Sequence, residues 1–575
     1  MRKVAWAAML LLALTGFAWA GQGTWELTLG TNAAPSSGFL AVSAVDENTF
    51  FTIGINQNSA YGAQYAWRST DAGSSLQCIY SAEFGGGDEC EMMNLFTFMI
   101  DGDWYDVDHG VIAGMGVPQS CIEENEFPAC MFVCMFQMKP FIWSVSDGGD
   151  TFTLTDESGN ITKTIVDVKV VGESIFSCGS NGLLRRSDDF GTTWVDLPPP
   201  ETGMNSIMND MWWLDTDTGF IGTGAPSEEK ANVKGEPNTY EELMAAYQAN
   251  VNYNQYVHGG AGRIELQESG YKMHTDGKAA FGNLYKTVDG GHTWEKIYDG
   301  GGVYSILKVQ FLNEKIGLIM TDEPVNENGG LSMILVTHDG GATFEKATLP
   351  EYGPSGSSMY AIDDVRMITP SLGYAACAEK SGFSYYSLFM VTTDGGLTWT
   401  HDTFSVVDGY PGNPNGYALI ALDFAGPERG FAVGMNLSAA RYTGTNDGPT
   451  ADAGDDFQVM VGQEAQLDGS GSTDPDGDLL LYQWTLVEGP AEVTFDDPNG
   501  EQPIFTPTTA GSYTFELEVS DIEFQSTDQV TVTVVPGQPG DDDDNDTVVD
   551  DDDNDDNDQG AEGDDDDDST GGCGC

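Results

Sequence analysis

The chain is poor in basic residues and histidine, and after its first twenty residues it has no long apolar run. Lysine and arginine together number 22, against 91 aspartates and glutamates, which gives a net charge of -69. A field of that sign repels nucleic acid and anionic lipid, so we expect neither as a partner. The six histidines show no metal-ligand spacing, and phosphate-loop, dinucleotide-binding and nucleophile-elbow motifs are missing. We therefore expect no required cofactor and assign no catalytic residue.

The first twenty residues have the features of a secretory signal peptide. A basic start and an apolar run at residues 2–17 are followed by small residues at the cleavage position, 18–20. No later run approaches the roughly 18 apolar residues that cross a bilayer, so we predict no transmembrane segment. The sequence predicts an exported protein, secreted or held at the cell surface, whose mature chain begins at Gly21.

A short phrase recurs along residues 21–446 and organises that part of the chain. Its pattern is Ser/Thr-x-Asp-x-Gly-x-Thr-Trp/Phe, as in "TVDGGHTW" and "TTDGGLTW". Its aspartates are Asp71, Asp147, Asp189, Asp289, Asp339 and Asp394, and its tryptophans are Trp194, Trp294 and Trp399. Asp and Gly together favour a tight turn with local hydrogen bonds, and we expect the aromatic residue to pack between neighbouring sheets.

The phrase is similar to the Asp-box, or BNR, repeat of sialidase-type, sortilin-type and photosystem-assembly-factor-type propellers. Each copy follows an alternating run and a small-residue strand, which completes a four-stranded blade. The first strands of these units are expected near residues 38, 96, 164, 207, 303, 359 and 418. The resemblance implies an all-β fold with a seven-bladed β-propeller.

The last repeat unit lacks its fourth strand, and the start of the mature chain has the matching sequence. Residues 418–446 contain three strands and then stop without an Asp-box. The stretch "GTWELTLG" fits the gap when Trp25 is aligned with Trp294, which also places Thr24 on Thr293. We predict that this amino-terminal strand closes the ring and removes two exposed sheet edges.

Long insertions predict a binding rim on one face of the propeller. They occupy residues 77–95, 117–138 and 225–281, in connections opposite the Asp-box turns. The third insertion has a helical pattern at 239–250 and an aromatic, relatively basic character that suits a binding surface. Packing of this segment on its own propeller is the alternative. The candidate binding residues are Tyr240, Tyr247, Tyr253, Tyr256 and Arg263.

Most of the nine cysteines fall in the first three repeat units. Six of them predict three disulfides of undetermined pairing in an oxidising compartment: Cys78, Cys90, Cys121, Cys130, Cys134 and Cys178. The alternative for "CMFVCMFQM" is copper or zinc binding by Cys130 and Cys134 with the interleaved methionines. Cys377 is expected as a buried apolar residue, and Cys573 and Cys575 as a point of surface attachment.

The pattern changes after residue 446. Residues 447–536 show short alternating strands and resemble a polycystic-kidney-disease-type (PKD) immunoglobulin-like β-sandwich, with Trp484 in its core and Tyr513 at the tyrosine corner. Asp474, Asp476 and Asp478 have the oxygen density of a calcium loop, and an Asx turn explains them equally well. Residues 537–575 form an acidic tail that we expect to be disordered.

Together these features predict an exported bacterial cell-surface or secreted protein that uses its rim to bind an extracellular protein or glycan. A sialidase-type site needs three arginines, and only Arg263 and Arg366 of the seven in the mature chain have no structural explanation. An extracellular glycoside hydrolase with two propeller carboxylates is the alternative. A spacer without a specific ligand is the third interpretation.

Overall fold

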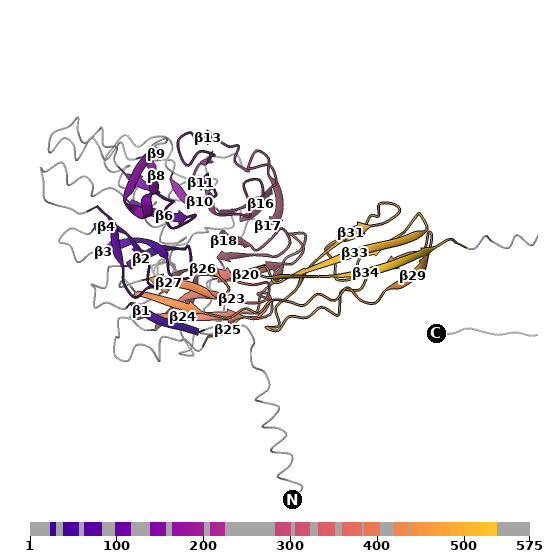
Figure 1. Cartoon of the computed structure of the whole chain (residues 1–575). Coiled ribbons are helices and arrows are strands. Elements are labelled where there is room, and N and C mark those ends of the chain that lie inside the picture. Colours follow the sequence, from indigo (N-terminus) through magenta and orange to yellow (C-terminus); the bar gives the residue numbers. More distant parts are fainter. Residues whose placement is uncertain are drawn as a thin grey trace, which may run out of the picture.

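The structure is a computed structural model that shows a ring of sheets followed by a β-sandwich (Figure 1). The residues that it describes are 24–29, 38–56, 63–82, 98–116, 139–156, 164–200, 207–224, 282–300, 305–322, 332–350, 359–381, 384–402, 419–434 and 438–537. The predicted signal peptide, the tail beyond residue 537, most of the three insertions and the five binding candidates of the third lie outside these ranges.

The described strands of the propeller form seven four-stranded antiparallel sheets. The first four blades, each given from its first to its fourth strand, are β2 (Gly38–Ala44), β3 (Phe50–Asn56), β4 (Ala63–Ser69) and β5 (Gln77–Ala82); β6 (Phe98–Trp104), β7 (Gly110–Gly116), β8 (Lys139–Ser146) and β9 (Thr151–Asp156); β10 (Ile165–Val171), β11 (Ser174–Gly179), β12 (Leu184–Ser187) and β13 (Val195–Asp196); β14 (Ile207–Trp213), β15 (Gly219–Gly224), β16 (Asn283–Thr287) and β17 (Glu295–Asp299).

The remaining blades follow the same order. They are β18 (Ile306–Phe311), β19 (Gly317–Asp322), β20 (Ser332–Thr337) and β21 (Glu345–Lys346); β22 (Met359–Met367), β23 (Gly373–Ser381), β24 (Ser384–Thr392) and β25 (Thr400–His401); β26 (Leu419–Gly426), β27 (Arg429–Gly434), β28 (Ser438–Thr443) and β1 (Thr24–Leu29). First strands of neighbouring blades contact each other around the ring, which places them innermost. The predicted seven-bladed all-β propeller is confirmed.

The seventh blade joins the two ends of the ring. Strand β1 pairs antiparallel with β28, so that Trp25 lies opposite Tyr442 and Glu26 lies opposite Arg441. Glu26 and Arg441 form an ion pair of 2.7 Å across this seam. Trp25 is buried in an aromatic cluster with Tyr374, Phe389, Phe424 and Tyr442. The predicted closure by the amino-terminal strand is confirmed.

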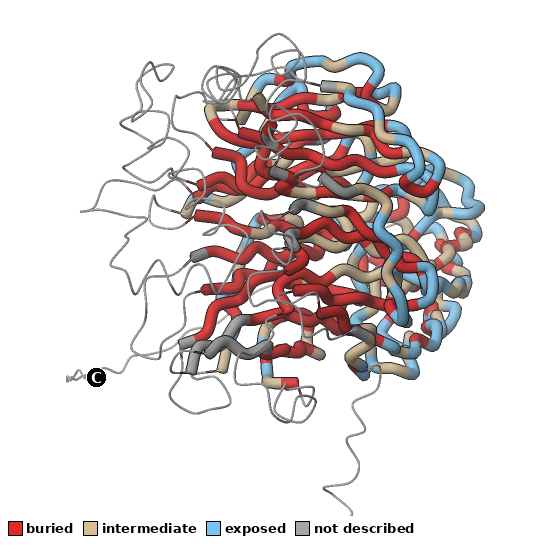
Figure 2. The backbone as a smooth tube through the Cα atoms, turned by 90° about the vertical axis from the view of Figure 1, so that its left-hand side faces the viewer, coloured by how far each residue is buried: buried red, intermediate tan, exposed pale blue. Residues whose placement is uncertain are grey.

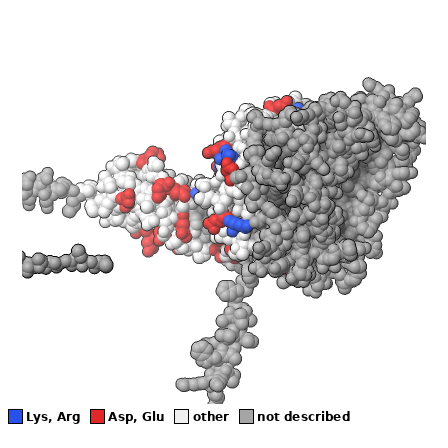
Figure 3. All heavy atoms as spheres, turned by 180° about the vertical axis from the view of Figure 1, so that it is seen from behind, with Lys and Arg blue, Asp and Glu red and all other residues white. Residues whose placement is uncertain are grey.

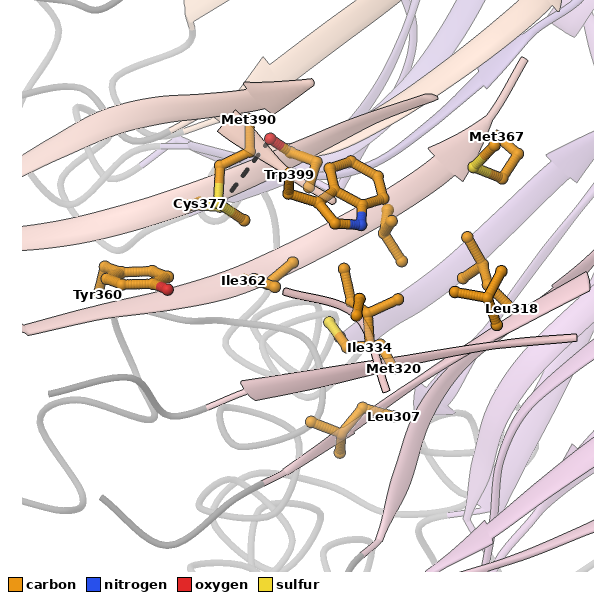
Figure 4. Close-up of a cluster of buried hydrophobic side chains, with 14 of the residues drawn as sticks. Leu307, Leu318, Met320, Ile334, Tyr360, Ile362, Met367, Cys377, Met390 and Trp399 are labelled. Atoms are coloured by element: carbon orange, nitrogen blue, oxygen red, sulfur yellow. Dashed lines mark hydrogen bonds between the residues drawn. The ribbon is translucent and has the colours of Figure 1, made fainter. Parts of the chain in front are cut away.

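Apolar side chains between neighbouring sheets form the propeller core. Strand β20 is buried at all six positions, whereas both residues of the outer strand β21 are exposed. Figure 2 shows the same gradient, with buried strands inside and exposed backbone at the turns. Strands covered on both faces have near-continuous apolar sequences for this reason. The largest cluster joins blades 5 and 6 and includes Trp399 and Cys377 (Figure 4). The expectation that Cys377 is a buried apolar residue is confirmed.

The Asp-box turns join the third and fourth strands of blades 1 to 6. In blade 4, Asp289 accepts hydrogen bonds from the backbone and hydroxyl of Thr293, at 2.8 and 2.6 Å. Gly290 and Gly291 have φ values of 70° and 88°, a conformation that strains other residues. A Cβ on Gly291 would also lie 2.9 Å from the Leu197 side chain. In blade 2 the turn is the 3-10 segment η2 (Asp147–Gly149).

The carboxy-terminal domain is a β-sandwich. Its strands are β29 (Phe457–Met460), β30 (Ala465–Gln466), β31 (Leu481–Glu488), β32 (Ile504–Phe505), β33 (Gly511–Ser520) and β34 (Gln525–Val535). Trp484 is buried in the core, and the Tyr513 hydroxyl donates to the Thr509 carbonyl at 2.9 Å. The predicted core tryptophan and tyrosine corner are therefore confirmed.

Candidate functional site

All seven first strands are irregular at the same place, and this irregularity sets which side chains reach the axis. Pairing of β10 with β11 skips one residue between Ile165 and Asp167, and the other first strands skip at the corresponding position. Such a bulge bends a strand and re-aims its side chains. The residues just after the skip are the first tier: Ala41, Asp101, Asp167, Asp210, Lys308, Asp364 and Ala421. Those two positions later are the second tier: Ser43, Asp103, Lys169, Trp212, Gln310, Arg366 and Asp423.

The two tiers surround a cavity of about 260 Å³ on the propeller axis, and every tier residue except Gln310 lines it. Ala41, Ser43 and Ala421 come from blades 1 and 7 and have small side chains, which leaves space on that side. The other blades contribute larger or charged side chains. Asp423 is the one charged tier residue from these two blades, so most of the cavity charge comes from blades 2 to 6.

The carboxylates of both tiers join each blade to the next. Asp167 accepts the Met211 backbone N–H at 2.7 Å, and Asp210 accepts the Val309 N–H at 2.7 Å. The same bond is made by Asp101 to Val168 (3.0 Å), Asp103 to Val170 (2.8 Å), Asp364 to Leu422 (3.1 Å) and Asp423 to Ala44 (2.8 Å). At the two remaining junctions Ser43 and Gln310 accept the N–H groups of Trp104 and Met367. Every blade junction is thus hydrogen-bonded at the axis.

Three cations share the cavity with the six carboxylates. Lys169 lies 3.0 Å from Asp167, and Arg366 lies 2.9 Å from Asp364. Lys308 stands between Asp210 at 3.6 Å and Asp364 at 3.8 Å. In these aspartates Oδ2 bonds the neighbouring blade while Oδ1 faces the cation. With all groups ionised, the cavity would carry more negative than positive charge.

Burial shifts the protonation of these groups. It raises the pKa of Asp423 to about 6, although Arg366 opposes the shift. Burial also raises the pKa of Asp103 and Asp210, and raises that of Asp167 well above its ordinary value. The pKa of Lys169 is raised because the surrounding carboxylates outweigh the effect of its burial. For these carboxyl groups, folding therefore favours the protonated form relative to the unfolded chain.

The Asp-box residues predicted from the sequence lie in the turns, away from the axial cavity. Each aspartate bonds residues of its own turn, as at Asp71, Asp189, Asp339 and Asp394. Trp294 and Trp399 donate their indole N–H to the carbonyls of Gly291 and Gly396. Trp194 packs under the guanidinium of Arg185. These residues shape the blades.

The basic residues that precede the Asp-boxes link neighbouring blades, in line with the structural role expected of them. Arg68 donates to the Gly148 carbonyl of the next blade at 2.7 Å, and Arg186 donates to Thr216 at 2.8 Å. Of the two arginines without a structural explanation, Arg366 belongs to the axial cavity and Arg263 lies outside the described residues.

Cys178 corrects part of the disulfide prediction. It is a free thiol, fully buried in β11 with its Sγ 3.7 Å from the Met208 carbonyl. Its position in the sequence groups it with the disulfide-forming cysteines of the first three repeat units, but β11 carries it into the packed sheet, where burial raises its pKa. Cys78 lies exposed in β5, and its disulfide stays a prediction. Cys90, Cys121, Cys130 and Cys134 lie outside the described residues, as do Cys573 and Cys575.

The loop at Asp474, Asp476 and Asp478 forms the Asx turn that was the alternative to calcium. Asp474 Oδ1 accepts the backbone N–H groups of Asp476 and Asp478 at 2.8 and 3.1 Å. Asp476 accepts from Asp447, and Asp478 accepts hydroxyls from the propeller. Within the described ranges no three His, Cys, Asp or Glu side chains are placed to hold a metal ion. Calcium binding stays a prediction.

The axial cavity was missed by the sequence analysis, although the sequence carries a signal for it. Aligning the first strands would have shown a charged residue recurring two positions after an apolar one, as in "MIDGD", "IVDVK" and "MNDMW". Over the stretches that the structure describes, no helix is long and apolar enough for a membrane span.

Comparison with known proteins identifies the second domain. Residues 453–534 match the family model for the PKD domain of KIAA0319-like proteins. A rat protein, the dyslexia-associated protein KIAA0319 homolog, is 31% identical over 120 residues, which are 20% of this chain and 11% of the relative. The chain thus spans about a tenth of the length of that relative.

Two solved propellers resemble the fold at low identity. YCF48 from Cyanidioschyzon merolae has a TM-score of 0.42 and 13% identity, covering 73% of this chain and 98% of the other. A GH74 enzyme from Niastella koreensis has a TM-score of 0.40 and 12% identity, covering 87% and 74%. At such similarity these likenesses concern the fold alone. The chain combines a seven-bladed propeller with a PKD domain.

Proposed function

We propose that this propeller with its PKD domain is an exported binding or scaffold protein, which holds an extracellular protein or glycan on its rim. The supporting observation is that the axial carboxylates hold neighbouring blades together. Six carboxylates, together with Ser43 and Gln310, bond the blades to one another around the whole ring. A ring joined in this way is a stiff frame for binding segments in its connections.

The same bonds weigh against the hydrolase alternative. A glycosidase needs one carboxyl group as acid and another as base or nucleophile, both within reach of the sugar. Here one oxygen of each axial carboxylate already accepts a backbone N–H, and Asp167 and Asp364 have their second oxygen on a cation. The second oxygens of Asp167 and Asp364 could act on a substrate only by giving up these cation contacts.

The position of the rim follows from where the strands end. Strand β7 ends at Gly116 and β8 begins at Lys139, while β15 ends at Gly224 and β16 begins at Asn283. Both connections leave the end of the sheet opposite the Asp-box turns, because antiparallel strands alternate in direction. Residues 117–138 and 225–281 therefore attach to one face.

A glycan array and a panel of chromogenic glycosides test the proposal on the secreted full-length protein. We expect binding to one ligand class and no turnover. Replacing Tyr240, Tyr247, Tyr253 and Tyr256 by alanine should weaken binding about 10-fold or more, since aromatic residues dominate such surfaces. Alanine at the exposed Tyr105 on the other face is the matched control. Turnover that disappears with Asp423→Asn would establish the hydrolase instead.

A further inference from the structure

The PKD domain contacts the Asp-box face of the propeller at blades 5 and 6. Asp478 of the PKD domain accepts hydrogen bonds from the hydroxyls of Thr369, at 2.8 Å, and Ser371. Lys315 lies 3.4 Å from Asp497. Thr369 and Ser371 belong to the first hairpin loop of blade 6, and Lys315 to that of blade 5. In these three pairs the propeller side chain is the donor and the PKD carboxylate is the acceptor.

The other blades provide an internal comparison for Thr369. In blades 1, 2, 4 and 5 the equivalent loops begin with Asp46, Asp106, Asp215 and Asn313, whose Oδ1 accepts the N–H groups two and three residues later. In blade 6 the Thr369 hydroxyl takes this role, accepting the Leu372 N–H at 3.0 Å. A hydroxyl can also donate a hydrogen bond, which a carboxylate cannot. Thr369 therefore caps its own loop and still binds Asp478.

A second position in the same loops differs in the same way. Two residues after the cap, blades 1, 2 and 4 have Asn48, Asp108 and Asp217, whereas blades 5 and 6 have Lys315 and Ser371. These positions are equivalent, because the carbonyl of each accepts the first N–H after its own Asp-box aspartate. Of these five loops, the cation and the hydroxyl occur in the two that the PKD domain touches.

We propose that Lys315, Thr369 and Ser371 form a docking surface for the PKD domain, specialised within the repeat to receive Asp478 and Asp497. Charge complementarity supports it: Figure 3 shows acidic side chains scattered over the sandwich, while the basic ones visible lie at its propeller end. Asp478 is held by two hydroxyls from one loop, so the PKD domain keeps a fixed orientation on the propeller. This inference is independent of which ligand the rim binds.

The docked orientation places the far end of the PKD domain on the opposite side of the propeller from the rim connections. Beside the propeller, Asn446 bonds Asp521, which precedes β34. Strand β34 then runs 11 residues to Val535, and at about 3.3 Å per residue this carries the chain roughly 35 Å outward. The Asp-box face thus carries the PKD domain as a stalk, and the rim connections leave the opposite face.

Zero-length carbodiimide cross-linking of the full-length protein tests the docking. An amide between Lys315 and Asp497 reports the docked state, and one between Lys286 and Glu314, 2.9 Å apart within the propeller, is the internal reference. Thr369→Asp introduces the residue that blades 1, 2 and 4 use, so it keeps the loop cap but sets a carboxylate against Asp478. We expect the Lys315–Asp497 product to fall about tenfold or more, as like charges in contact cost several kcal/mol.

Three further variants make the result decisive. Asn48→Asp adds a carboxylate to the equivalent loop of blade 1, away from the PKD domain and at the position that matches Ser371, and should leave both products at the wild-type yield. Adding Asp478→Asn to Thr369→Asp should restore docking, since an amide donates to a carboxylate. A wild-type yield in Thr369→Asp, or no Lys315–Asp497 product in the wild type, would overturn the proposal. If Thr369→Asp also loses the reference product, the variant has disturbed the propeller, and Asp478→Ala is used in its place. An unchanged Lys315–Asp497 yield in Asp478→Ala would overturn the docking proposal, and a reduced yield would support it.

Discussion

At the scale of single residues, the axial aspartates show how one side chain type serves two purposes. Asp423 accepts the backbone N–H of Ala44 across the seam between blades 7 and 1, and it lies 3.8 Å from Arg366. The hydrogen bond stabilises the ring, while burial of the charge opposes ionisation. The contribution of Asp423 to stability must therefore depend on pH.

The pKa of Asp423 predicts greater stability in mild acid. Its folded pKa of about 6 lies above its ordinary value of 3.8. The folded state then binds the proton more tightly, so this contribution is fully present below pH 3.8 and is lost as pH rises through 6. The loss amounts to about 3 kcal/mol.

Asp423→Asn measures this effect. The amide oxygen can still accept from Ala44, and there is no charge to desolvate. We expect the free energy of unfolding of the variant, from urea titrations at pH 4.5 and 7.5, to fall about 2 kcal/mol less with pH than in the wild type, because part of the contribution is already lost at pH 4.5. Asp196→Asn is the control, since the Asp196 carboxyl is 85% exposed. Equal pH dependence in the wild type and Asp423→Asn would contradict the assignment.

At the scale of elements, strand β1 decides whether the propeller is a closed ring. It supplies the outer strand of blade 7, more than 400 residues away from its neighbour β28 in sequence. Without it, β28 would present an unpaired edge, which invites pairing with another chain. The strand was predicted because its own residues repeat the Asp-box phrase at the tryptophan, so a local comparison was sufficient.

Trp25→Ala tests the closure. Trp25 is 7% exposed and touches four aromatic rings. Truncating it should lower the free energy of unfolding by about 3–5 kcal/mol, the range for large buried aromatic residues. Thr24→Ala, an exposed position of the same strand, should change it by less than about 0.5 kcal/mol. Similar losses in both variants would mean that the strand, and not the tryptophan, carries the stability of the seam.

At the scale of the whole molecule, the charge of -69 is a further determinant of stability. Like charges spread over the surface repel one another, and salt screens this repulsion. The buried axial pairs are screened much less than the surface.

Salt should therefore stabilise the protein. We expect the melting temperature to rise between 0.05 and 0.5 M NaCl, by about 2–4 °C for each kcal/mol of repulsion relieved. Sorbitol at the same osmolality controls for effects of the solute other than charge. An unchanged or lower melting temperature in salt would show that ion pairs outweigh the net repulsion.

The number of blades, their order, the closing strand and the fold of the second domain could all be predicted from the sequence. Each of these depends on residues close together in the chain: an Asp-box turn, an alternating strand, a tryptophan followed by a tyrosine corner. Turn chemistry and strand periodicity act locally, and their repetition along the chain makes the pattern recognisable in the sequence.

The contacts between distant side chains could not be predicted in this way, because they depend on the folded arrangement. Asp423 reaches Ala44, and Thr369 reaches Asp478, because ring closure and domain docking bring distant segments together. The bulge in each first strand changes which alternate residues face the axis, and a one-residue change of register reverses that choice. Cys178 was misplaced for the same reason. Its burial depends on the sheets packed around it, and these come from residues that are distant in the sequence.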